Sequence, residues 1–514
     1  MQLRRKLGNL WWMKRSPSHP QSALWEYPFA VSEKLSSGPL RLTYLLFAIG
    51  MLPVLLFLGV DRFPFWARVT AWVGVVSALF PAVNLVSNPR ARPSSVAGLT
   101  LMISLCYFLA SLHEERLLLR WGEARITNGS VSLAMLYAAT GVVVLQCGNW
   151  FGGILGIPKM IPKIRIPLPD RALILGGACV VLFSLSVDVF RLRGMLPRSQ
   201  QIISILSVLA PIDLGYAMLL LPSLRPGQDR FPTLFWGFTA VSGLTALMSG
   251  SLVPMVQPLF TYLLAWLLIR RRLRLWPIAV GILAVLLFQP VKGEFRSKVW
   301  DREARLTLFE RAQLFVDLSA RHWFGTETDK TVDRERSVKI AAARTASALQ
   351  LSHIIEMTPS AVPFQQGATY RYFRYALLPR AFFPDKPSAQ YADVWAAVVY
   401  GYTTVSGTQH VMVGLPQLSE SYLNFGFVGG LLIMLLCGLL LRIVDELLAH
   451  KTAGTGAAAL YLFFAHQVVR TFEGSAAQFW GGALQQFGFY GLLLWLYGSV
   501  YRIATAEDRT PTRV

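Results

Sequence analysis

One short stretch of the chain alternates planar cations with aromatic rings. Residues 369–375 read Thr-Tyr-Arg-Tyr-Phe-Arg-Tyr. Aromatic rings stack on the faces of sugars, and guanidinium groups hold phosphate or carboxylate groups through paired hydrogen bonds. The stretch therefore indicates a surface that binds a charged glycan. An aromatic belt with flanking arginines at a membrane surface would give the same pattern.

A proline-rich segment follows at once. Three prolines within residues 378–387 restrict the backbone to an extended course. They place Arg380, Asp385 and Lys386 on one stiff loop. The loop is therefore suited to present its charged groups in a constant arrangement.

Lys292 and Arg296 lie one helical turn apart, directly after a long apolar run that ends at Pro290. Both head groups can then project toward the lipid head groups. They open a charge-rich segment, residues 291–339, in which large apolar residues recur at helical spacing. We expect an amphipathic helix there, with a solvated face of ion pairs. A further helix is expected over Ser337–Met357.

Glu420, Tyr422 and Asn424 stand at the entrance to the next long apolar run. Gly426 and Gly430 follow them and permit the close approach of another helix or of lipid. The free amide groups at a helix start favour an anion. This helix start is a second place where polar residues meet the bilayer.

All these residues belong to, or border, a polar segment of 130 residues, Val291–Glu420, between two blocks of apolar runs. With 54% hydrophobic and 15% charged residues, the chain has too much apolar surface for a soluble protein of 514 residues. Each apolar run of about 20 residues predicts a transmembrane helix, because lipid cannot satisfy backbone amides. We therefore predict an all-α polytopic membrane protein with about twelve transmembrane helices, nine before the polar segment and three after it: Thr43–Val60, Phe65–Val86, Val96–Leu112, Val131–Trp150, Ala172–Phe190, Ile202–Pro222, Thr233–Ser249, Leu252–Ile269, Trp276–Pro290, Leu423–Ile443, Gly456–Phe472 and Leu484–Ile503.

The distribution of Lys and Arg predicts how the chain is oriented. These residues gather in alternate short loops, which marks the cytoplasmic side. Both termini are then cytoplasmic, and the large loop between helices 9 and 10 is on the outer face. The net charge of +21 reflects this asymmetry and attraction to anionic lipid rather than binding of nucleic acid. The predicted parts are a basic tail (1–42), helices 1–9 (43–290), the large loop (291–420), helices 10–12 (421–503) and a second tail (504–514).

Four sequence elements in and around the loop carry a family resemblance. They read Val-Lys-Gly-Glu-Phe-Arg at 291–296, Thr-Pro-Ser-Ala-Val-Pro-Phe at 358–364 with Gly-Ala-Thr-Tyr at 367–370, Leu-Pro-Arg-Ala-Phe-Phe-Pro-Asp-Lys-Pro at 378–387, and Glu-Ser-Tyr-Leu-Asn-Phe-Gly at 420–426. In this order they resemble the Wzy-type oligosaccharide repeat-unit polymerases of bacterial O-antigen, capsule and exopolysaccharide biosynthesis. The resemblance covers the chain from the ninth to the tenth predicted helix.

The resemblance implies a glycosyltransferase of the bacterial inner membrane, with its large loop in the periplasm. Such an enzyme transfers the growing glycan from one undecaprenyl-pyrophosphate carrier to a new lipid-linked repeat unit. A chain-length regulator and a flippase of the same pathway would be its partners. Clustered cations in the loop suit the departure of a pyrophosphate group. The loop has no DxD-type pair of carboxylates, so we expect neither a metal ion nor another cofactor.

The same chemistry assigns roles to individual residues. For the pyrophosphate and the glycan, the expected binding residues are Arg296, Arg371 and Arg380, then Lys292, Arg344 and Lys386, together with Tyr370, Tyr422 and Asn424. A base must take a proton from the attacking sugar hydroxyl, and the candidates are Glu420, Asp385 and His410. His353 is a fourth, more typical of a hydrogen-bonded histidine within a helix.

Two other interpretations stay open. A ligase that transfers a lipid-linked glycan to lipid A or to protein would share the carrier chemistry and the large loop. A flippase or exporter would require charge inside the helices, where ionisable residues are sparse. Arg470 is one such residue, and it forms either an ion pair with Glu473 or part of the wall of a carrier pocket. The four cysteines lie in separate apolar runs and predict neither a disulfide nor a metal site.

Overall fold

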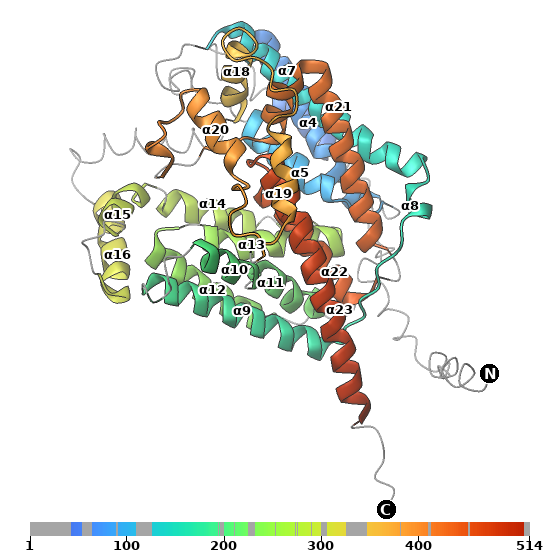
Figure 1. The fold of residues 1–514 in the computed structure, drawn as a ribbon, viewed down its shortest axis with the longest axis vertical. Coiled ribbons are helices and arrows are strands. Elements are labelled where there is room, and N and C mark those ends of the chain that lie inside the picture. The colour runs from blue at the N-terminus through green and yellow to red at the C-terminus, as the bar shows by residue number, and fades with distance from the viewer. Residues whose placement is uncertain are drawn as a thin grey trace, which may run out of the picture.

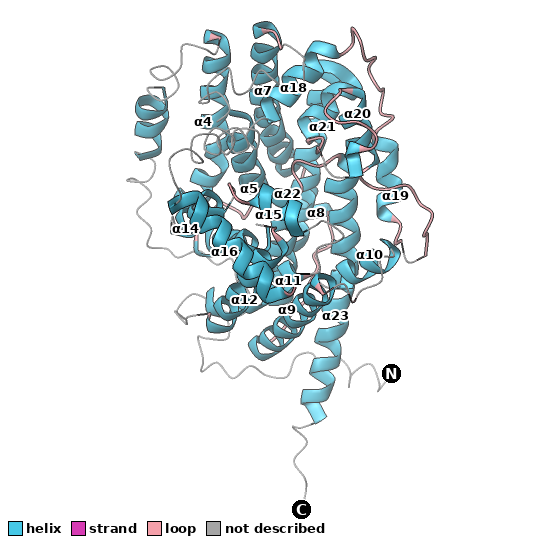
Figure 2. Ribbon diagram, turned by 90° about the vertical axis from the view of Figure 1, so that its left-hand side faces the viewer, coloured by secondary structure: helices cyan, strands magenta, loops and turns pink. Residues whose placement is uncertain are grey.

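The computed structural model describes residues 43–53, 64–88, 91–108, 126–193, 195, 200–209, 211–224, 232–251, 253–272, 274, 276–288, 290–299, 306–324, 347–380, 382–409, 413–450 and 453–507. Within these ranges every regular element is a helix, so the prediction of an all-α protein is confirmed there (Figures 1 and 2). The α-helices of the first half are α4 (Phe65–Ser87), α5 (Ser95–Ile103), α7 (Asn128–Ile154), α8 (Ile157–Met160), α9 (Asp170–Leu192), α10 (Gln200–Leu209), α11 (Ile212–Leu220), α12 (Thr233–Ser249) and α13 (Val253–Ala265). Those of the second half are α14 (Trp276–Phe288), α15 (Lys292–Val299), α16 (Leu308–Phe324), α18 (Ser347–Met357), α19 (Phe373–Leu377), α20 (Tyr391–Val399), α21 (Gln417–Leu448), α22 (Gly454–Arg470) and α23 (Ala483–Glu507).

The number of membrane-length helices differs from the prediction. Four of the described helices are long and apolar enough to cross a membrane, namely α4, α7, α9 and α21. This is the pattern of a multi-pass membrane protein. The prediction of about twelve such helices is wrong for the described part of the chain, where shorter apolar helices occupy Ser95–Phe108, Ile212–Leu224, Thr233–Ser249 and Met255–Arg270.

Local breaks explain much of this difference. The predicted run Ile202–Pro222 is divided near Pro211, which has no amide hydrogen, so that α10 ends at Leu209 and α11 begins at Ile212. The run Val96–Leu112 changes from α-helix to π-helix after Ile103. An apolar run shows which residues avoid water, but it does not show whether their backbone forms one straight helix.

The helices form two groups with α22 between them. One group contains α4, α5, α7, α18 and α21, and the other contains α9, α11, α12, α13 and α14. The residues of α22 from Gly454 to Val469 are all buried, and this helix contacts α5 as well as α11 and α13 (Figure 1). Its apolar surface therefore serves protein packing rather than lipid contact.

Glycines bring α7 and α21 into close contact. A methyl group added to Gly438 of α21 would overlap the carbonyl oxygen of Leu145, and one added to Gly148 of α7 would overlap that of Leu435. Small residues of this kind let two helix backbones approach each other within a membrane. The close approach predicted for Gly430 is confirmed, since an added methyl group there would overlap the hydroxyl of Tyr137.

The polar segment 291–420 divides into two unlike parts. The first contains α15 and α16, which pack on each other through Phe295, Val299 and Phe315 in a small apolar cluster of their own. The helical character predicted for 291–339 is thus found over these two helices, although Phe309 is 77% exposed. The second part begins with α18, which matches the predicted helix from Ser347 onward and packs against α7 and α21. Helices α18 and α20 and the start of α21 are therefore part of the main helical core.

Candidate functional site

Glu420 lies in the first turn of α21 and is completely buried, with 0% of its surface exposed. One carboxylate oxygen accepts a hydrogen bond from the Thr369 hydroxyl at 2.7 Å. The other accepts one from the backbone amide of Ala476 at 2.5 Å. Glu420 therefore joins three segments far apart in the chain: the loop before α19, the start of α21 and the turn that follows α22.

Asn424 extends this network by one helical turn. Its side-chain amide nitrogen donates to the Thr369 hydroxyl at 2.7 Å, and its side-chain oxygen accepts from the backbone amide of Gly367 at 2.9 Å. The helix breaks at Gly426, whose φ of 67° and ψ of −161° are not helical. The backbone amides of Gln365 and Gln366 donate to the carbonyl oxygens of residues 423 and 424 just before this break. The break thus lets the loop bind directly to the helix start, as glycine alone readily permits.

A second buried carboxylate, Asp393 of α20, holds the same turn. One oxygen accepts from the amides of Leu415 and Ser475 at 2.8 and 3.1 Å, and the other accepts from the Ser475 hydroxyl at 2.7 Å. Burial raises the pKa of Asp393 to about 6, although these hydrogen bonds oppose the rise. The turn is therefore held on one side by Glu420 and on the other by Asp393.

The surface around α19 carries the cations and rings predicted for glycan binding. Arg371 and Arg374 are exposed, and their guanidinium carbons lie 5.3 and 4.7 Å from the ring centres of the tyrosines that follow them, Tyr372 and Tyr375. The ring of Tyr372 stacks on that of Tyr391 at 4.3 Å. Tyr372 is itself buried, so the stack fixes the exposed ring of Tyr391 near exposed cations, an arrangement suited to a sugar that carries negative charge.

The proline-rich loop is held by its own cations. The guanidinium of Arg380 donates to the carbonyl oxygens of Pro384 and Lys386 at 2.9 and 3.2 Å. The Lys386 ammonium donates to the carbonyl oxygens of Tyr375, at 2.8 Å, and Leu378. Burial and the nearby Arg380 lower the pKa of Lys386. Asp385 is exposed at the tip of the loop.

The structure brings only some of the predicted site residues together. Glu420, Asn424 and Tyr370 meet at the start of α21, where the ring of Tyr370 stacks on Phe425 at 5.9 Å and Tyr422 packs against Tyr137. Burial and the charge of Glu420 raise the pKa of Tyr370 well above its usual value. Arg371, Arg380, Asp385 and Lys386 lie on α19 and the loop after it.

Lys292 and Arg296 lie elsewhere, on α15. Arg296 donates to the carbonyl oxygen of Gly250 at 3.0 Å, next to the apolar cluster that joins α15 to α16. His410 and Arg344 fall outside the described residues. His353 is buried in α18 and its Nε2 lies 3.1 Å from the carbonyl oxygen of Tyr400, so it is a hydrogen-bonded helix histidine. In the described ranges, no three His, Cys, Asp or Glu side chains are placed to hold a metal ion together.

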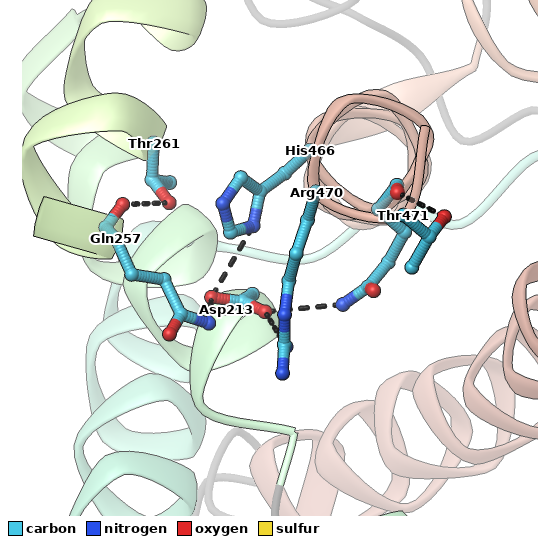
Figure 3. A network of polar contacts seen from close by, with 7 residues as sticks. Asp213, Gln257, Thr261, His466, Arg470 and Thr471 are labelled. Carbon is cyan, nitrogen blue, oxygen red and sulfur yellow. Dashed lines mark hydrogen bonds and ion pairs between the residues drawn. The ribbon is translucent and has the colours of Figure 1, made fainter. Parts of the chain in front are cut away.

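Sequence reasoning missed a third buried carboxylate, that of Asp213 in α11. Figure 3 shows side chains from α13 and α22 converging on it. One oxygen accepts from the side-chain amide of Gln257 and lies 3.2 Å from Nδ1 of His466, and the other is 3.0 Å from Nε2 of Gln467 and 3.3 Å from Nη1 of Arg470. The structure thus pairs Arg470 with a residue 257 positions earlier, whereas an ion pair with Glu473 and the wall of a carrier pocket were the two alternatives left open by the sequence. The spacing of His466 and Arg470, one turn apart in an apolar helix, was the available signal.

Comparison with known proteins places the chain in one family. Residues 97–489 match a family described as a domain of unknown function (DUF8712). The chain belongs to that family. The matched range contains both buried carboxylates that hold the turn after α22, the α19 surface and the Asp213 cluster. No curated protein and no solved structure matches the chain.

Proposed function

We propose that this protein is a bacterial inner-membrane glycosyltransferase that polymerises undecaprenyl-pyrophosphate-linked oligosaccharide repeat units. The observation that carries the proposal is the α19 surface, where exposed Arg371 and Arg374 stand beside the stacked rings of Tyr372 and Tyr391. This surface is tied through Thr369 and Glu420 to the start of a membrane-length helix. A substrate with a sugar chain, a diphosphate and a lipid tail requires these three features side by side.

The distribution of charge supports an outward-facing α19 surface. At the far end of α21, Arg442 pairs with Glu446, and Arg92 pairs with the same carboxylate. The exposed Lys163 and Arg165 flank Ile164, whose carbonyl oxygen lies 2.9 Å from Nε2 of His450, just beyond that end of α21. A basic end of a membrane protein faces the cytoplasm as a rule. The start of α21 and the α19 surface would then face the periplasm.

The proposed reaction assigns different roles to Asp385 and Glu420. A sugar hydroxyl of the incoming unit attacks the anomeric carbon of the growing glycan. The bond from that carbon to the pyrophosphate oxygen breaks, and the pyrophosphate leaves with its carrier lipid. Asp385 is exposed and can accept the hydroxyl proton, whereas both oxygens of Glu420 are buried and hydrogen-bonded. Glu420 then acts as a positioning residue, and Arg371 and Arg380 compensate the charge of the leaving group.

The test is to complement a deletion strain of the native host and separate its surface glycan on a gel. The deletion should retain single repeat units and lose the ladder of longer chains. Arg371→Ala should fail to restore the ladder at equal protein level, because it removes an exposed cation with little structural role. Arg321→Ala, which removes an exposed arginine of α16 away from this surface, is the matched control and should restore it. A full ladder with Arg371→Ala would remove the α19 surface from the reaction.

Two outcomes of the same deletion point to other functions. Polymer that accumulates on the carrier lipid and is absent from its final acceptor would indicate a ligase. Loss of all lipid-linked units from the periplasmic face would indicate a flippase. The observation that bears on this candidate is the contact of buried Asp213 with buried His466 and with Arg470, whose side chain is 48% exposed, since ionisable residues among apolar helices often mark transport paths. However, the Asp213 carboxylate is already engaged by four neighbouring side chains, which suits a structural lock between α11, α13 and α22 better than a transport site.

A further inference from the structure

A cleft of about 430 Å³ lies at the end of the molecule opposite the α19 surface. It is enclosed by the last turns of α4, α7 and α21 and by the segment before α5. Its volume falls within the range of roughly 300–1,000 Å³ that is usual for ligand sites. No residue of this cleft takes part in the function proposed above.

The polar wall of the cleft presents donors that lack acceptors. Nε of Arg442 and Nδ2 of Asn149 are both buried, and neither has a hydrogen-bond partner within the described part of the chain. A buried donor without an acceptor costs about 1–3 kcal/mol. Both residues also line the cleft, so a small turn of either side chain would bring its unpaired donor to a ligand with acceptor oxygens.

The charge of the cleft identifies the kind of acceptor. Arg442 lies within hydrogen-bond distance of Glu446 at 2.5 Å, and Arg92 contacts the same oxygen of that carboxylate. Two cations therefore share one anion, which leaves an excess positive charge at the cleft. The side chain of Arg92 is 59% exposed, so it can move toward a ligand at the rim. A phosphate group satisfies both the charge and the free donors.

The remaining wall is apolar, and its residues Phe80 and Ile154 are exposed. Phe80, Leu85, Val96 and Ile154 line the cleft, and Trp150 at its rim is 63% exposed. Tryptophan is typical of the membrane interface, where its ring lies at the level of the head groups. From Phe427, just after the break at Gly426, to Arg442 the helix α21 rises by about 22 Å, most of the thickness of a hydrocarbon core, about 30 Å. The cleft is thus at the interface opposite the start of α21.

We propose that this cleft binds the phosphate head group of an anionic diacyl phospholipid from the leaflet opposite the α19 surface. Arg442 and Asn149 bind the phosphate oxygens, Arg92 closes over them, and the acyl chains lie along Phe80, Trp150 and Ile154. The site is independent of the proposed polymerase activity, because it is at the other end of α21.

The experiment uses the purified full-length protein in mild detergent, with phosphatidylglycerol and phosphatidylcholine of equal chain length as probes. Native mass spectrometry should show phosphatidylglycerol retained at least several-fold better than phosphatidylcholine. Arg442→Gln and Arg92→Gln should each abolish most of this preference. Arg165→Gln is the matched control, because it removes an exposed cation at the same end of the protein but outside the cleft, and it should keep the preference.

Three results would overturn the proposal. Equal retention of the two lipids by the wild type would show that the cleft has no preference for an anionic head group. An equal loss in Arg165→Gln and Arg92→Gln would show diffuse attraction to a basic surface. Displacement of phosphatidylglycerol by millimolar inorganic phosphate would assign the cleft to a free phosphate compound instead. If Arg442→Gln elutes as an aggregate in size-exclusion chromatography, Arg92→Gln and Asn149→Leu decide whether the cleft binds the lipid. Unchanged preference for phosphatidylglycerol in both variants would overturn the proposal.

Discussion

Replacing Glu420 by alanine should detach the start of α21 from its two neighbouring segments. The Thr369 hydroxyl and the Ala476 amide, which donate to Glu420 at 2.7 and 2.5 Å, would lose their acceptors in a buried site. Each buried donor left unpaired costs about 1–3 kcal/mol, so the free energy of unfolding should fall by about 2–6 kcal/mol. The cavity left by the missing side-chain atoms adds to this loss.

Glutamine at the same position separates hydrogen bonding from volume. Its oxygen can still accept from the Ala476 amide, and its amide can donate to the Thr369 hydroxyl oxygen, which also accepts from Asn424 at 2.7 Å. Only the hydroxyl hydrogen of Thr369 is then without an acceptor. Glu420→Gln should therefore cost about 1–2 kcal/mol, and Thr369→Val should cost a similar amount. Combining the two should cost less than their sum, because both remove the same hydrogen bond.

The assay is thermal unfolding of the purified full-length variants in one detergent, followed by size-exclusion chromatography. The wild type should have the highest melting temperature and Glu420→Ala the lowest. The single variants Glu420→Gln and Thr369→Val should melt between them, at similar temperatures. Glu294→Ala is the control, since the Glu294 side chain is 54% exposed and its ion pair with Lys298 is at the surface. If Glu420→Ala melts within experimental error of Glu294→Ala, the network around Glu420 does not hold these segments together.

Two further predictions concern Asp393 and Gly438. Burial raises the pKa of Asp393 from 3.8 to about 6, so the folded state binds its proton more tightly than the unfolded state. The stability of the wild type should therefore decrease by up to about 3 kcal/mol as pH rises from about 4 to about 6, and should then level off. Asp393→Asn, titrated in parallel by thermal unfolding, should lack that decrease, and an identical pH profile in both proteins would contradict the buried charge. Gly438→Ala should lower the melting temperature by several degrees, because its methyl group overlaps the carbonyl oxygen of Leu145. The control is Gly243→Ala on α12, which has no atom within 4 Å of the added carbon and should be neutral or slightly stabilising. Equal melting temperatures of the two variants would show that α7 and α21 can separate at no cost.

The amino-acid sequence by itself determined the helical character of the chain, its membrane-type composition and the residues of the α19 surface. These features depend on local patterns: apolar runs, alternating arginine and tyrosine, and prolines that stiffen one loop. The same local reasoning overestimated the membrane-length helices, because hydrophobicity does not show where a helix breaks, as it does near Pro211. Hydrophobicity also does not distinguish contact with lipid from burial inside the protein. Helix α22, whose residues from Gly454 to Val469 are buried, is the clearest case.

Only the tertiary structure decided which polar residues meet. Asp213 binds Arg470 across 257 positions, and Glu420 binds Ala476 across 56, distances in sequence over which no spacing rule applies. Glu420 was the first of several candidate bases, yet the packing of the segments around Thr369 and Ala476 against the start of α21 encloses it between two donors. Lys292 and Arg296 lie on α15, whose apolar residues belong to a different cluster from those of α19. Side-chain type limits what chemistry is possible, but the long-range packing of helices selects the residues that perform it.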